Sequence, residues 1–227
     1  MHILIIAVLL FALIAGPGMW VKMIMQRYSK PERRYAYSGA DTARRLLKSL
    51  GLHEVAVEVT ESGDHYDPIA KAVRLSAPNH DGYSLTAVTI AAHEVGHAMQ
   101  DSLGYTPLRL RTRLVRWVSP IEKTGAALLM ATPLIVALIR VPAAGLLMVL
   151  GGLLSLLSGA AVHFLTLPTE YDASFARALP LLKQEGVLIP GDEKHARKLL
   201  KAAALTYVSV ALMSLLNIAR WWAILRR

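Results

Sequence analysis

The stretch TIAAHEVGHAMQ, Thr89–Gln100, decides how the rest of this chain is interpreted. It places His93 and His97 four residues apart, with Glu94 directly after the first histidine. On an α-helix this spacing puts both imidazoles on one face, one turn apart, where they can bind a single metal ion. Glu94 projects beside them and can act as a general base on a water molecule without being a ligand. We expect the helix to span Leu85–Leu103.

The composition of the 227 residues indicates a membrane protein with a water-facing part. Hydrophobic residues make up 54%, more than is usual in a soluble domain, while 18% of residues are charged. We attribute the net charge of +9 to contact with anionic lipid and to membrane topology. Nucleic acid is not an expected partner, because the sequence has no basic patch with interleaved aromatic residues. Since there is no cysteine, a metal site must use His, Asp or Glu.

The charge pattern predicts several crossings of the membrane. Ile3–Val21 carries no charge and approaches the length that spans the ~30 Å hydrocarbon core. Basic residues follow it, so we expect a retained anchor whose downstream side is cytoplasmic. The expected segments are a transmembrane anchor at 1–25, a cytosolic-facing segment at 26–117, a transmembrane hairpin at 118–167, and a ligand-bearing helix with a C-terminal membrane helix at 168–227.

Local patterns predict the remaining elements. A helix is expected at Ser38–Leu50, capped by Ser38 or Asp41. The residues HYDP, 65–68, are expected to form a turn between two strands. The strands are expected at Val55–Thr60 and Ala70–Ser76, the apolar hairpin at Ile121–Ile139 and Val141–Leu167, and the last two helices at Thr169–Leu182 and Lys194–Leu225.

A catalytic zinc site needs a third protein ligand. Nearby alternatives are His80, Asp81 and Asp101. A helix rarely surrounds one ion with three successive turns, so a carboxylate on a second helix is favoured. Glu170 fits, because two apolar stretches separate it from the motif and an even number of crossings returns the chain to the same membrane face. Asp172 is the fallback ligand, or else an acceptor that orients an imidazole N–H.

Five motifs resemble a known family over most of the chain. They are DHYDP with AVRLS, AAHEVGHAMQ, GYTPLRLR, LPTEYDAS and AAALTYVSVALMSLL, in this order. The sequence resembles the YugP-like neutral zinc membrane peptidases and, more distantly, the gluzincins. The resemblance implies a mainly α fold: an integral-membrane helical bundle with a small α+β gluzincin-like protease domain, whose short sheet offers an edge strand to the substrate.

The resemblance also implies the site. One zinc ion per chain would be held by His93, His97 and Glu170, with Glu94 as base, in an endopeptidase of the bacterial inner membrane that cleaves peptides or proteins on the cytoplasmic side. Ser174 stands where gluzincins carry an aspartate, so Asp172 is expected to orient an imidazole. The substrate-binding edge strand matches Ala72, Val73, Arg74 and Leu75.

A second donor for the developing oxyanion is also expected. The candidates of the family-like motifs and their neighbours are His65, Tyr66 and Arg177, with Tyr83, Tyr105 and His163 as further ones. The rival interpretations are a catalytically inactive, metal-stabilised membrane scaffold or holdase, and a metal transporter. A transporter is disfavoured because the histidine motif lies in a polar segment and not in a spanning helix.

Overall fold

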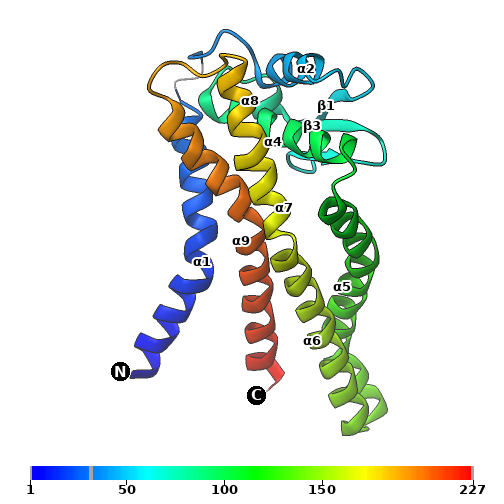
Figure 1. Ribbon diagram of the computed structural model, residues 1–227. Helices are drawn as coiled ribbons and strands as arrows, with labels where there is room; N and C mark the ends of the chain where they lie inside the picture. The colour runs from blue at the N-terminus through cyan, green and yellow to red at the C-terminus, as the bar shows by residue number, and fades with distance from the viewer. Residues whose placement is uncertain (1, 31–32, 226–227) are drawn as a thin grey trace. The chain divides into compact units, whose positions relative to one another are not determined.

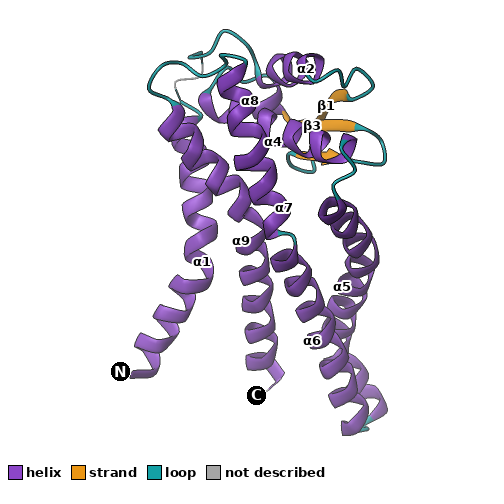
Figure 2. Cartoon of the chain, in the orientation of Figure 1, coloured by secondary structure: helices purple, strands orange, loops and turns teal. Residues whose placement is uncertain are grey.

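The computed structural model describes residues 2–30 and 33–225, which form a mainly helical chain with one small sheet, as expected (Figure 2). Its contacts divide the chain into two compact units. We call Met19–Arg109 with Leu167–Thr206 the mixed unit, and Met1–Gly18, Leu110–Thr166 and Tyr207–Arg227 the helical unit. The elements in chain order are α1 (His2–Tyr28), α2 (Gly39–Ser49), β1 (Ala56–Thr60), β2 (His65–Asp67), β3 (Ala72–Ser76), α3 (Ala77–His80), α4 (Leu85–Ser102), α5 (Thr106–Ile139), α6 (Pro142–Leu165), α7 (Leu167–Tyr171), the π-helix η1 (Asp172–Ala178), α8 (Leu179–Gln184) and α9 (Glu193–Leu225).

The helical unit contains the apolar hairpin that the sequence predicts. The connection between α5 and α6 is short: Arg140 has a positive φ of 55° and Pro142 is the first residue of α6. The two helices lie side by side (Figure 1), and a Cβ added at Gly152 would meet the Leu129 side chain at 2.5 Å. Among the described residues, two helical stretches are long and apolar enough to cross a membrane, Thr106–Ile139 and Ala143–Gln184.

Two expected membrane segments are helical, but their membrane role stays a prediction. The N-terminal apolar stretch lies within α1 and the C-terminal one within α9. The basic run 109–117 is continuous with the first apolar stretch, so α5 begins fifteen residues before the expected start at Ile121. The four-segment division at residues 25, 117 and 167 likewise stays a prediction.

Helix α4 forms the centre of the mixed unit. Its sequence is apolar or small on most sides, which is the pattern of a buried helix. It packs on α2, β3, α8 and α9 within one apolar cluster (Figure 1). The fully buried members from these elements include Leu46, Val73, Leu75, Val95, Leu182 and Leu200. The predicted helix at α2 is also confirmed, and Ser38 is its cap because its hydroxyl accepts from the Asp41 N–H.

The sheet has the order β1-β3-β2, with β1 parallel and β2 antiparallel to β3. The two predicted strands are confirmed as β1 and β3. The predicted turn at HYDP is wrong in part, since His65–Asp67 forms β2. Tyr66 explains this, because its ring is buried and its hydroxyl donates to Asp101 on α4 at 2.8 Å. A tertiary contact therefore overrides the local turn signal.

The expected position of the edge strand is also wrong. Ala72–Leu75 lies in β3, which is the central strand of the sheet. Residues 72–74 pair with β2 on one side and 72–76 with β1 on the other, so β3 has no open edge along most of its length. The outer edges of this sheet belong to β1 and β2.

The chain from Leu167 to Gln184 is one helical run that packs against α4, which confirms the predicted helix at Thr169–Leu182. Its middle, η1, has π-helical hydrogen bonding. This form is rare in proteins, but where it occurs it is often near a functional site. Gly96 of α4 lies close to it: an added Cβ would lie 2.6 Å from the Ala173 carbonyl oxygen. The absence of a side chain at Gly96 therefore lets η1 lie directly against the histidine helix.

Candidate metal centre

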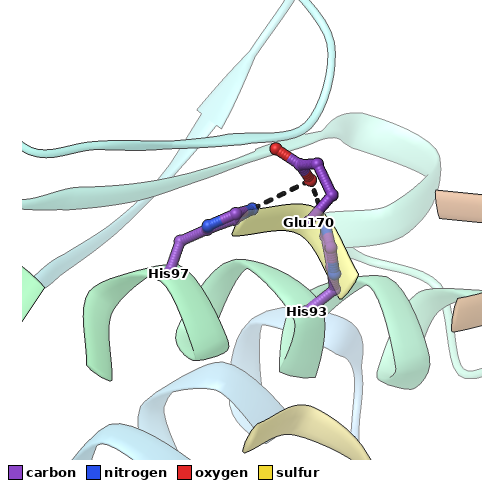
Figure 3. A group of neighbouring side chains, drawn as sticks. All are labelled: His93, His97 and Glu170. Carbon is purple, nitrogen blue, oxygen red and sulfur yellow. Dashed lines mark hydrogen bonds and ion pairs between the residues drawn. The ribbon is translucent and has the colours of Figure 1, made fainter. Parts of the chain in front are cut away.

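Three side chains converge in the mixed unit from two elements (Figure 3). Nε2 of His93 and Nε2 of His97 each lie 3.2 Å from Oε2 of Glu170. The two imidazole rings, one turn apart on α4, stand nearly perpendicular at 78° with centroids 4.8 Å apart. Among the described residues, these three form the group of His and acidic side chains able to hold a metal ion together.

The spacing of these atoms fits zinc. Ligand atoms at the corners of a tetrahedron around zinc, with bonds of about 2.0–2.1 Å, are about 3.3 Å apart. The two nitrogen-to-oxygen distances of 3.2 Å agree with this value. Glu170 is 0% exposed, so it is not a solvent-facing carboxylate that merely complements the helix dipole at the start of α7. Two imidazoles, one carboxylate and a fourth position for water form the donor set of a catalytic zinc site.

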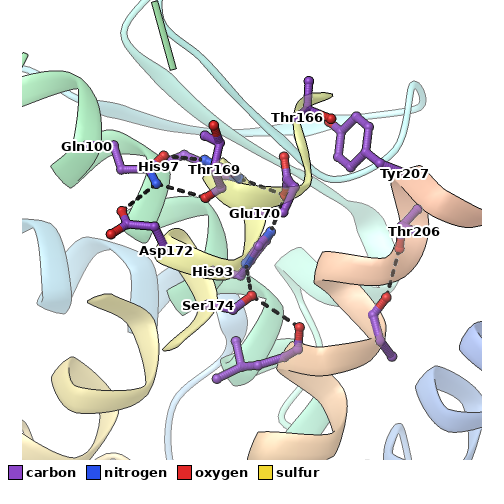
Figure 4. A network of polar contacts seen from close by, with 12 residues as sticks. His93, His97, Gln100, Thr166, Thr169, Glu170, Asp172, Ser174, Thr206 and Tyr207 are labelled. Atoms are coloured by element: carbon purple, nitrogen blue, oxygen red, sulfur yellow. Dashed lines mark hydrogen bonds and ion pairs between the residues drawn. The ribbon is translucent and has the colours of Figure 1, made fainter. Parts of the chain in front are cut away.

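The far side of the His97 imidazole is held by Gln100 (Figure 4). Nδ1 of His97 lies 2.9 Å from Oε1 of Gln100. The amide Nε2 of Gln100 donates to the Thr169 carbonyl at 2.9 Å and to Oδ2 of Asp172 at 2.7 Å. Because the amide nitrogen already has two acceptors, its oxygen faces His97 and the Nδ1 of His97 must carry the proton.

The far side of the His93 imidazole is held by Ser174 (Figure 4). Nδ1 of His93 lies 3.0 Å from the Ser174 hydroxyl, which lies 3.1 Å from the Leu200 carbonyl of α9. A carbonyl only accepts, so the hydroxyl hydrogen points to Leu200 and the oxygen accepts from the Nδ1–H of His93. Both imidazoles therefore carry their proton on Nδ1.

This assignment explains what the site is built to bind. With both Nδ1 atoms protonated, the neutral imidazoles present two Nε2 lone pairs towards one carboxylate oxygen of Glu170. In this form three acceptor atoms meet in a buried position, and they repel one another unless a metal ion or a proton lies among them. The arrangement is the one in which outer hydrogen bonds orient ligands towards a metal.

The other expected ligands have different partners. Asp172 accepts from Gln100 and from Nε of Arg177 at 2.6 Å, so it supports His97 indirectly and Ser174, not Asp172, contacts His93. Asp101 accepts from Tyr66 and Lys71. His80 pairs with its neighbour Asp81. Glu94, the expected base, is not one of these ligand candidates. It is 5% exposed, and its position lies about 60° from that of His97 around the axis of α4.

The oxyanion candidates have the following places. His65 on β2 has its Nδ1 2.8 Å from the Gly63 carbonyl. Tyr66 donates to Asp101, and burial together with this carboxylate raises the pKa of the Tyr66 phenol. Arg177 donates to Asp172 and stacks 5.3 Å from the centroid of the Tyr105 ring. The structure thus gives Tyr66 and Arg177 other acceptors, and the oxyanion role of these residues stays a prediction.

Sequence reasoning did not identify Gln100 or the contact of Ser174 with His93. Gln100 lies three residues after His97, on the same face of α4, so helical spacing could have indicated it. The sequence marks Ser174 only as a departure from the gluzincin pattern. Its role depends on the packing of η1 against α4 and α9, which local spacing does not show.

Comparison with known proteins agrees with this geometry. Residues 2–226 match the protein family described as "Putative neutral zinc metallopeptidase". The chain belongs to this family. Over 211 residues it is 39% identical to "Putative membrane protease YugP" of Bacillus subtilis (strain 168). The alignment covers 88% of this chain and 86% of that protein. No solved structure matches. The resemblance to the YugP-like zinc peptidases that the sequence shows is therefore confirmed.

Proposed function

We propose that this member of the zinc metallopeptidase family is a membrane-embedded endopeptidase, with one zinc ion held by His93, His97 and Glu170 and with Glu94 as the general base. The observation that carries the proposal is the convergence of two Nε2 atoms on Oε2 of Glu170 at 3.2 Å, with each Nδ1 engaged elsewhere. The family description supports the metal and the reaction class.

The residues divide the chemistry among them. When bound, zinc polarises water and lowers its pKa to about 7. Glu94, next to His93 on α4, takes the proton from the attacking water and later gives it to the leaving amine. Because Glu94 is 5% exposed, its carboxylate acts in a region of low polarity, where charge interactions are stronger than in water.

The test is Glu94→Gln in the full chain in detergent or lipid nanodiscs. We expect zinc content equal to that of the wild type, because Glu94 is not a ligand, and loss of casein cleavage by at least about a hundredfold. Glu61→Gln, the same change at an exposed position, is the matched control. Retained cleavage would reject Glu94 as base, and lost zinc would make it a ligand.

The same experiment separates the peptidase from a metal-stabilised scaffold or holdase. A scaffold would bind zinc equally well in the wild type and in Glu94→Gln and would cleave nothing in either form. Prevention of aggregation of an unfolded client without its cleavage would support the scaffold. Cleavage that depends on Glu94 and is stopped by a chelator would support the peptidase.

We propose that the substrate backbone pairs with the outer edge of β2, His65–Asp67, since β3 is central. β2 contacts α4 directly, through the bond from Tyr66 to Asp101 one turn beyond His97. An extended peptide can add as a further strand there through main-chain hydrogen bonds. Asp67→Pro should raise KM above that of Asp67→Ala, which loses the same carboxylate but keeps the main-chain N–H.

We also propose that the mixed unit faces the cytoplasm. The natural chain has no cysteine, so a single Ser62→Cys variant in the exposed loop after β1 reports its side of the membrane. An impermeant maleimide should label this variant only after the cells are opened. Labelling of intact cells would place the unit outside.

A further inference from the structure

We propose that Gln100 is a positioning residue: it fixes the Nδ1–H form of His97 and thereby sets the affinity of the site for its metal. The inference rests on the proposed metal site and deepens it. Gln100 is not a proposed ligand and lies outside the motif His93–His97, and it is 0% exposed. Its amide lies between the imidazole of His97 on one side and the α7–η1 run on the other (Figure 4).

An amide can face a neighbour with either end, and the two ends have opposite effects. With the oxygen towards His97, Nδ1 must donate and Nε2 keeps its lone pair. With the nitrogen towards His97, Nδ1 must accept, so the proton moves to Nε2 and blocks metal binding. The partners of Gln100 therefore decide the outcome.

Those partners are both acceptors. The main-chain carbonyl of Thr169 cannot donate, and it lies 2.9 Å from the amide nitrogen of Gln100. The carboxylate of Asp172 lies 2.7 Å from the same nitrogen. Reversing the amide would set its oxygen against both acceptors and leave buried groups without hydrogen bonds, which is unfavourable. The orientation seen is therefore the stable one.

Asp172 is itself held in its acceptor role. Nε of Arg177 donates to the Asp172 carboxylate at 2.6 Å, and the Arg177 guanidinium lies over the Tyr105 ring. The guanidinium of Arg177 only donates, so Oδ2 of Asp172, which contacts both Arg177 and Gln100, accepts from both. The result is one directed chain of hydrogen bonds from His97 through Gln100 to Asp172. In this chain of hydrogen bonds Asp172 and Arg177, which are not ligands, act by holding Gln100 in the orientation that His97 needs.

The two ligand histidines differ in how firmly their neighbours fix the position of the ring proton. The Ser174 hydroxyl beside His93 can rotate and can both donate and accept, so only the Leu200 carbonyl directs it. The amide of Gln100 has no such freedom, because both its ends are used. We therefore expect the proton position on His97 to be more strictly determined than that on His93.

The test is Gln100→Leu in the full chain, which keeps the approximate volume and removes the acceptor. Zinc affinity, measured by competition with a chelator, should fall by about 10- to 100-fold. In metal-free protein labelled with ¹⁵N at histidine, NMR should show His97 as the Nδ1–H form in the wild type and as a mixture in the variant. Gln184→Leu, the same change at an exposed position of α8, is the matched control and should change neither measurement.

A second variant guards against misfolding of the first. Asp172→Leu leaves Gln100 in place but removes one of the two acceptors that lock its amide, so zinc affinity should fall by a smaller factor. Asp172→Asn, whose oxygen can still accept from Gln100, should restore most of it.

The outcomes separate this inference from the proposed function. The positioning role would be overturned if Gln100→Leu kept wild-type zinc affinity and an unchanged His97 signal, and the metal site would then stay intact. If Gln100→Leu does not fold, the same result in Asp172→Leu would overturn it. A wild-type chain that binds no zinc would overturn the metal site itself.

Discussion

The packing at Gly96 gives the sharpest quantitative prediction. In Gly96→Ala the new Cβ would lie 2.6 Å from the Ala173 carbonyl oxygen and 3.3 Å from its carbon. An ordinary contact of about 3.4 Å requires these atoms to separate by about 0.8 Å. Both belong to main chain, which no side-chain rotation can move aside. We therefore expect α4 and η1 to move apart.

That movement acts on the metal centre. His93 and His97 lie on α4 while Glu170 lies just before η1, so separation lengthens both nitrogen-to-oxygen distances. Metal sites tolerate about 0.2 Å in ligand distances, several times less than the shift. We expect zinc affinity to fall by more than tenfold, or more than about 1.4 kcal/mol. Overpacking costs about 1–3 kcal/mol, and the better helix propensity of alanine returns at most about 1 kcal/mol.

The assay combines chelator competition with thermal unfolding of the metal-free protein in detergent. Gly151→Ala in α6 is the control, because a Cβ there meets nothing within 4 Å. It should bind zinc normally and unfold at the same temperature or slightly higher. The reasoning is refuted if Gly96→Ala binds zinc as tightly as the wild type and is no less stable.

Three further predictions concern single side chains. Glu170→Ala should remove most bound zinc from the purified protein by elemental analysis, and unchanged zinc content would reject Glu170 as ligand. Ser174→Ala deprives the Nδ1–H of His93 of its acceptor and should weaken zinc binding by about tenfold in the same competition assay, whereas unaltered binding would deny this hydrogen bond a role. Asp192, buried, accepts from the Tyr35 hydroxyl and from Arg34, so Asp192→Asn should lower the free energy of unfolding by about 1.5–3 kcal/mol at neutral pH. Burial opposes ionisation of Asp192, but the bonds from Tyr35 and Arg34 outweigh it and lower its pKa, so this stability is present above about pH 4 and is lost below it. The difference between wild type and variant should therefore shrink in acid, and a constant difference would contradict the assignment.

Local spacing is sufficient for the core of the site. His93 and His97 are held by the geometry of one helix, so four residues of sequence predict that they share a face, whatever surrounds them. The same holds for Glu94, for the cap at Ser38 and for the apolar hairpin, whose length and composition are local properties. These features depend on backbone regularity and hydrophobicity, which neighbouring residues already encode.

Features that join distant parts of the chain needed the tertiary structure. The sequence favours Glu170 over Asp172 and Asp101 only through topology and resemblance, and it is the packing of η1 on α4 that brings the Glu170 carboxylate next to both imidazoles. The order of the sheet, which makes β3 central, likewise depends on pairing between strands and not on the alternation within one. Gln100 and Ser174 acquire their roles through partners far along the chain. Such contacts are decided by how closely surfaces pack, here by the missing side chain of Gly96, and no local pattern specifies that distance.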